Sequence, residues 1–69
     1  MTRKQYIRRI SELITAIYNH PESEKTRRNQ LGISLKYSRD HANEVIETHG
    51  SYAKAWESLK PARDFFGVE

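Results

Sequence analysis

The stretch Gln30-Leu31-Gly32-Ile33-Ser34 is compatible with two different folds, because it places a glycine inside a helical pattern. Residues that alternate by four and three, as on one helix face, run through and beyond it: Leu31, Leu35, Ser38, Ala42, Val45 and His49. A continuous helix keeps Gly32 in its interior, at a cost of about 1 kcal/mol relative to alanine. A helix-turn-helix instead uses Gly32 as the turn, with Ser34 capping a second helix.

We expect the continuous alternative, in which residues 30–48 form one helix whose inner face holds the molecule together. Leu31, Leu35, Ser38, Ala42, Val45 and Ile46 then share an arc of about 100°. Ile33 and Tyr37 project to the opposite side as a small exposed apolar pair. The two alternatives therefore differ in the position of Ile33, which the helix-turn-helix would bury.

A first amphipathic helix is predicted from Arg3 to Asn19, with Thr2 and Gln5 as a capping box at its start. Its apolar arc is typical of a helix that packs on a core, and consists of Tyr6, Ile7, Ile10, Leu13, Ile14 and Ile17. Residues 19–23 then break the pattern. We expect the second helix to begin near Pro21 or Glu22 and to lie antiparallel to the first.

His49-Gly50-Ser51 is the second break, because Gly50 suits a left-handed helix end and Ser51 suits an N-cap. A third helix follows, with Trp56 as its main core anchor, and Pro61 stops or kinks it near Leu59 or Lys60. A short turn from Pro61 to Phe66, closed by Gly67, ends the pattern. The expected fold is an all-α, small three-helix bundle with a long central helix and a short C-terminal helical turn, in a single domain spanning residues 1–69.

Length and composition favour association. The chain has 69 residues and no cysteine, so one modest core has neither disulfides nor thiolate metal ligands to support it. Self-association or a firm partner is the remaining common source of stability. No run approaches the roughly 18 apolar residues of a membrane span, and no signal-peptide pattern is present. We therefore expect a cytoplasmic protein that does not associate with membranes.

The charge is divided unevenly along the chain. Residues 1–39 carry nine basic and three acidic side chains, a balance of +6, whereas residues 40–69 carry three and six, a balance of −3. A basic half is compatible with an anionic partner, such as nucleic acid, a membrane surface or an acidic protein, and equally with ordinary solvated helix faces. The candidate nucleic-acid-binding residues are Arg27, Arg28, Lys36 and Arg39 for phosphates and Asn43 for a base. Against a helix-turn-helix, Arg28 stands where a small residue is usual, and Ser38 and His41 stand at packing positions.

The sequence contains only weak indications of metal-binding or catalytic motifs. His41 and Glu44 share a helix face, but a metal site needs at least three converging ligands, so we expect no metal. The chain offers no cysteine nucleophile and no glycine-rich phosphate-binding loop. A bundle this small is also poorly suited to enclosing a dry pocket. We accordingly expect no catalytic residues, no cofactor, no small-molecule substrate and no enzymatic activity.

Aromatic side chains are many for so small a core: Tyr6, Tyr18, Tyr37, Tyr52, Trp56, Phe65 and Phe66. Ile33, Tyr37 and Phe65 are the candidate apolar contacts of a protein-binding surface, with Arg27, Arg28 and Arg39 supplying charge. The predicted function is that of a small non-enzymatic interaction protein, which binds a protein partner or itself, as a homodimer, through helix faces. The alternative is a small basic nucleic-acid-binding regulator with a helix-turn-helix-like segment around Gln30-Ser34.

Overall fold

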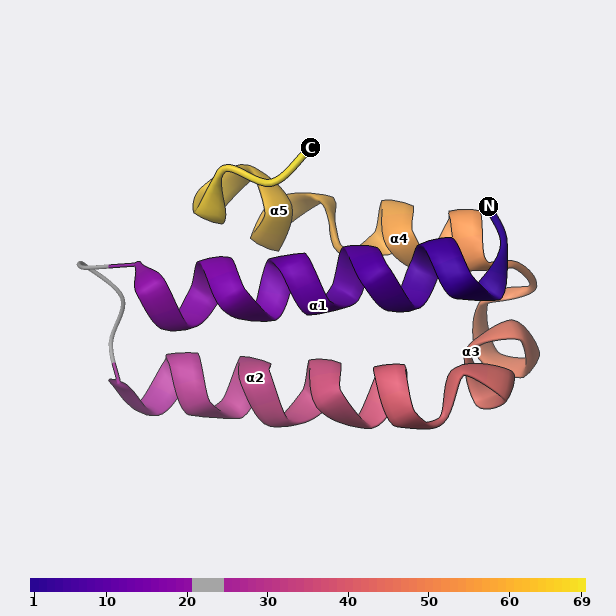
Figure 1. The fold of residues 1–69 in the computed structure, drawn as a ribbon, viewed down its shortest axis with the longest axis horizontal. Helices are drawn as coiled ribbons and strands as arrows, with labels where there is room; N and C mark the ends of the chain where they lie inside the picture. Colours follow the sequence, from indigo (N-terminus) through magenta and orange to yellow (C-terminus); the bar gives the residue numbers. More distant parts are fainter. Residues whose placement is uncertain (21–24) are drawn as a thin grey trace.

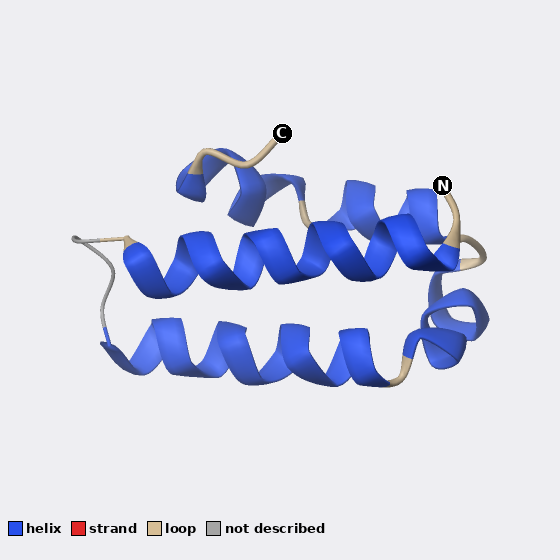
Figure 2. Cartoon of the chain, in the orientation of Figure 1, coloured by secondary structure: helices blue, strands red, loops and turns tan. Residues whose placement is uncertain are grey.

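Five α-helices and no strand make up the part of the chain that the computed structural model describes, residues 1–20 and 25–69, the side chains of residues 26 and 27 excepted (Figures 1 and 2). The helices are α1 (Arg3–Asn19), α2 (Lys25–Asp40), α3 (Ala42–His49), α4 (Tyr52–Ser58) and α5 (Lys60–Phe66). The all-α class is confirmed. The described residues are not specifically a three-helix bundle, because the predicted second helix is divided into α2 and α3. The predicted end of the third helix near Leu59 and the helical turn after it correspond to α4 and α5.

Helix α1 has the predicted bounds, and its start is held by the predicted capping box. The backbone N–H of Gln5 donates to Thr2 Oγ1 at 3.1 Å, and the N–H of Thr2 donates to Gln5 Oε1 at 2.9 Å. Its apolar face supplies the buried side chains Tyr6, Ile10, Leu13, Ile14 and Ile17. Within the described residues, α1 therefore contributes more of the core than any other helix.

The central helix is α1, not the second helix as the sequence predicted. α2 runs antiparallel along one side of α1, while α4 and α5 lie on the other side and α3 crosses the end of the pair (Figure 1). The other helices complete the core with Leu35, Ala42, Val45, Tyr52, Ala55 and Trp56. Trp56 is 4% exposed, as expected of a core anchor. The predicted start of the second helix, near Pro21 or Glu22, lies outside the described residues.

Helix α2 passes through Gly32 without interruption but ends at Asp40, so residues 30–48 are not one rod. The break is at His41, whose φ of −120° and ψ of 48° are not helical. The turn allows Ala42 and Val45 to reach the core from a new direction, and both are buried. It also rotates Ile46 outward to 43% exposure, which overturns its predicted place on the inner face.

The C-terminal helices are positioned by two left-handed glycines and one arginine. Gly50 has a φ of 90° and donates its N–H to Ile46 O, and Gly67 closes α5 with a φ of 73°, as predicted. Ser51 caps α4 by accepting from the N–H of Lys54 at 3.1 Å. Arg63 then fastens α5 to α4, because its Nη1 donates to the carbonyl of Trp56 at 3.0 Å and its guanidinium lies 4.7 Å from the indole centroid.

Candidate interaction surfaces

Gly32 is explained by a close helix–helix contact rather than by a turn. A Cβ on residue 32 would lie 2.8 Å from Cζ and 2.9 Å from Cε2 of Tyr18, so the tyrosine ring of α1 covers the glycine. Lys36, one turn further along α2, places its ammonium 4.9 Å from the centre of the same ring and donates to Tyr18 Oη at 3.5 Å. The helix-turn-helix geometry around Gln30-Ser34 is therefore wrong, and Ile33 is 66% exposed instead of buried.

Among the described basic side chains of α2, three of the candidate phosphate contacts are partly buried or engaged within the chain. Arg28 and Arg39 are each partly buried, and Arg39 Nε lies 3.2 Å from a carboxylate oxygen of Asp40. Lys36 is committed to the ring of Tyr18. Asn43 is exposed but belongs to α3, beyond the break. The side chain of Arg27 lies outside the described residues.

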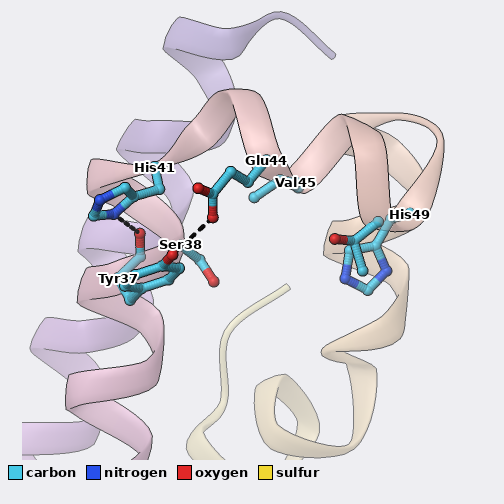
Figure 3. A pocket seen from close by; sticks show the side chains of 7 residues that line it. Tyr37, Ser38, His41, Glu44, Val45 and His49 are labelled. Atoms are coloured by element: carbon cyan, nitrogen blue, oxygen red, sulfur yellow. Dashed lines mark hydrogen bonds between the residues drawn. The ribbon is translucent and has the colours of Figure 1, made fainter.

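Tyr37 is exposed over 54% of its surface, yet it belongs to a bonded corner between α2 and α3. Its hydroxyl donates to Glu44 Oε2 at 2.8 Å, and its ring stacks on the His41 ring with centroids 4.1 Å apart (Figure 3). The hydrogen bond to the Glu44 carboxylate raises the pKa of Tyr37 above its ordinary value. These contacts join α2 to α3 across the corner.

The same corner lines a shallow hollow of about 160 Å³ formed by Tyr37, Ser38, His41, Glu44, Val45, Thr48 and His49. Figure 3 shows His41 and Glu44 gathered near Tyr37, with His49 away at the far end of α3. Within the described ranges, His, Asp and Glu side chains nowhere gather in a group of three that could hold a metal ion. The polar side chains at this corner can form hydrogen bonds to a polar group of a partner.

Phe65 stands at the rim of a more apolar hollow between α5 and α2. The hollow has a volume of about 280 Å³ and is lined by Leu31, Pro61, Ala62, Phe65 and Phe66. Phe65 is 59% exposed, and its ring meets that of Phe66 edge-on with centroids 4.9 Å apart. The ring of His20, at the end of α1, lies 5.3 Å from both. We name this surface the α2–α5 groove.

The structure separates the three predicted protein-binding residues into two surfaces. Ile33 follows Leu31 by two residues, which is about 200° of helix rotation, so it faces away from the α2–α5 groove that Leu31 lines. Ile33 and Tyr37 share the outer face of α2, since four residues separate them. Phe65 lies in the groove, without either of them among its lining residues.

Sequence reasoning missed most of the groove. At 100° per residue, Pro61, Ala62, Phe65 and Phe66 fall within an arc of about 140° on α5, a pattern that seven residues are too few to establish. Leu31 was placed on the inner face of α2 but not opposite α5. The adjacent pair Phe65-Phe66 was a usable signal. Neighbouring residues on a helix point about 100° apart, so a surface helix can bury only one of the two rings.

No family model, curated protein or solved structure matches this chain. Among the helices of residues 1–20 and 25–69, none combines the length and the apolar character needed to cross a membrane.

Proposed function

We propose that this chain is a small non-enzymatic interaction protein whose partner is a second copy of itself, bound through the α2–α5 groove. The observation that carries the proposal is Phe65, an aromatic side chain 59% exposed beside an apolar hollow. Large exposed aromatics next to apolar pockets are the usual anchors of protein interfaces. Burying such a ring removes apolar surface from water on both partners.

A second copy fits because the groove supplies both halves of a contact. In a dimer with two-fold symmetry, one surface patch meets the same patch of the partner. Phe65 of each protomer then enters the hollow of the other, against Leu31, Pro61 and Ala62. The short chain gains from this arrangement, since it has no cysteine and one modest core.

The corner around Tyr37 and the outer face of α2 are less suitable as a dimer interface than the α2–α5 groove. Tyr37 already donates its hydroxyl to Glu44 and stacks on His41, so part of its binding capacity is used within the chain. Ile33 then stands as a single exposed aliphatic side chain, and scattered residues of that kind are common on protein surfaces.

Sedimentation equilibrium over a wide protein concentration range tests the proposal. We expect the wild-type chain to dimerise and Phe65→Glu to raise the dimer dissociation constant by about 30-fold or more, as for an interface anchor worth about 2 kcal/mol. Ile33→Glu is the matched control, because it places the same carboxylate at an equally exposed position outside the groove. We expect it to dimerise like the wild type. Circular dichroism checks that both variants remain helical.

Two results contradict the proposal. The first is a wild-type chain that stays monomeric at all concentrations. The second is a dimer that Ile33→Glu disrupts and Phe65→Glu leaves intact, which would place the interface on the outer face of α2.

A further inference from the structure

The N-terminal half of α1 carries a cluster of exposed basic side chains. Arg3, Lys4, Arg8 and Arg9 are all exposed and lie within two turns of one helix. We name them the α1 basic surface. Lys4 and Arg8 are four residues apart and share the outward side of the helix, whereas Arg3 and Arg9 each lie about 100° further round, so that the four cations span about 240° of the helix. The surface therefore wraps the exposed side of a rigid helix.

These four cations have no carboxylate partners among the described residues. The ion pairs there join Arg39 to Asp40, Lys60 to Asp64 and Arg63 to Glu57, all outside α1. Shallow hollows lie on both sides of Arg8, one lined by Thr2, Lys4, Gln5 and Ile7 and the other by Arg9, Glu12 and Glu69. Two carboxylates thus share a hollow with Arg8 and Arg9, whereas the hollow between Lys4 and Arg8 contains none.

From this arrangement we infer that the α1 basic surface binds the phosphate backbone of duplex nucleic acid, without reading its sequence. Phosphates are held by closely spaced Lys and Arg side chains and need no apolar anchor. An acidic protein partner would need an apolar interface centre as well. In this half of the helix Tyr6 and Ile10 are turned inward at 2% and 0% exposure, and Ile7 is partly buried.

Two other polyanions fit the same surface less well. A membrane-bound helix lays its apolar face into the lipid, but the apolar face of α1 is covered by α2, α4 and α5 (Figure 1). Single strands are held by exposed aromatic rings on which bases stack. Among the described residues, the exposed aromatics are Tyr18 at the far end of α1, Tyr37 on α2 and Phe65 on α5, so none of them lies within the α1 basic surface. The backbone of a duplex remains as the best match.

Fluorescence anisotropy with a labelled 20-base-pair duplex of mixed sequence, titrated at 50, 100 and 200 mM salt, tests the inference. Four phosphate contacts give a slope of about −3.6 in log affinity against log salt, which is a loss of about 150-fold across this range. Lys4→Gln/Arg8→Gln removes two contacts, so we expect a slope of about −1.8 and a loss of only about 12-fold. Affinity at 50 mM salt also falls.

The matched control is Lys54→Gln/Lys60→Gln, which lowers the net charge equally at exposed positions on α4 and α5. We expect it to keep the wild-type slope. An equal effect of both double variants would overturn the inference, because it would show attraction by net charge alone. So would absence of binding at 50 mM salt. Tighter binding to polyglutamate or to phosphatidylserine vesicles than to the duplex, lost in the α1 variant, would also overturn it.

Discussion

Replacing Gly32 with alanine tests why a glycine stands in the middle of α2. In an exposed helix the substitution raises the free energy of unfolding by about 1 kcal/mol. Here the new Cβ would lie 2.8 Å from Cζ of Tyr18, well inside the separation at which carbon atoms pack. The tyrosine ring therefore has to swing away from α2.

The cost of that movement exceeds the gain in helix propensity. Tyr18 is 36% exposed, and if the ring moves far enough to expose roughly 70 Å² more of its surface, the cost is about 1.5–2 kcal/mol at about 25 cal/mol per Å². Losing the contact between the Lys36 ammonium and the ring adds about 0.5 kcal/mol. Set against the gain of about 1 kcal/mol, Gly32→Ala should lower the free energy of unfolding by about 1–1.5 kcal/mol.

The effect of Gly32→Ala on the free energy of unfolding should change sign when the Tyr18 ring is absent. In a Tyr18→Ala background, we expect Gly32→Ala to raise the free energy of unfolding by about 1 kcal/mol, which gives a coupling of about 2–2.5 kcal/mol between the two positions. Urea unfolding followed by circular dichroism measures all four chains. A gain of about 1 kcal/mol in both backgrounds would refute the packing of Tyr18 on Gly32. A loss in both would indicate a positive φ at residue 32 and restore the helix-turn-helix.

Three further predictions concern the helix ends and the corner. Gly50→Ala should lower stability by about 1–2 kcal/mol in thermal unfolding, because Gly50 has a φ of 90° and an L side chain is strained there; unchanged stability would contradict that backbone. Ser51→Ala should lower the free energy of urea unfolding by about 1 kcal/mol through loss of the cap on Lys54 N–H, and Ser51→Asp should retain it. The hydrogen bond to Glu44 raises the pKa of the Tyr37 hydroxyl above its ordinary value of 10.0. The stabilisation from this hydrogen bond is therefore fully present below about pH 10 and is lost as the pH rises through the raised pKa. NMR titration should show Glu44→Gln lowering this pKa, and an unchanged value would refute the hydrogen bond.

The sequence was sufficient for elements whose signals are local. The bounds of α1 follow from its apolar periodicity and from the Thr2–Gln5 capping box, both of which act within one or two turns. Gly50, Ser51 and Gly67 were likewise assigned correctly, because a left-handed helix end and a serine cap are set by the residue itself. The continuous helix through Gly32 was also expected, although its cause, the ring of Tyr18, is a contact 14 residues away in sequence.

The break at His41 was not predictable from local signals. Neither glycine nor proline stands there, and the spacing of Ala42 and Val45 continues the pattern of Leu31 and Leu35. The turn is set by packing, because α3 must cross the end of α1 before α4 and α5 can cover its other side. Periodicity reports which side chains are buried, but it does not report from which direction they enter the core.

The candidate surfaces depended on the same long-range packing. Phe65 was singled out correctly as exposed, but the groove beside it needs Leu31, which reaches α5 only in the folded chain. The basic residues of α2 were named for their charge alone. In the structure Lys36 lies on Tyr18 and Arg39 on Asp40, while the exposed cations of α1 were not among the candidate residues.

An isotope-filtered NMR experiment on a mixture of labelled and unlabelled chains tests the proposed pairing most directly. We expect intermolecular NOEs from the Phe65 ring of one protomer to the methyl groups of Leu31 and Ala62 in the other, because each ring would occupy the partner's groove. If the intermolecular NOEs come from Ile33 instead, or if none is seen at millimolar concentration, the groove is not where two copies meet.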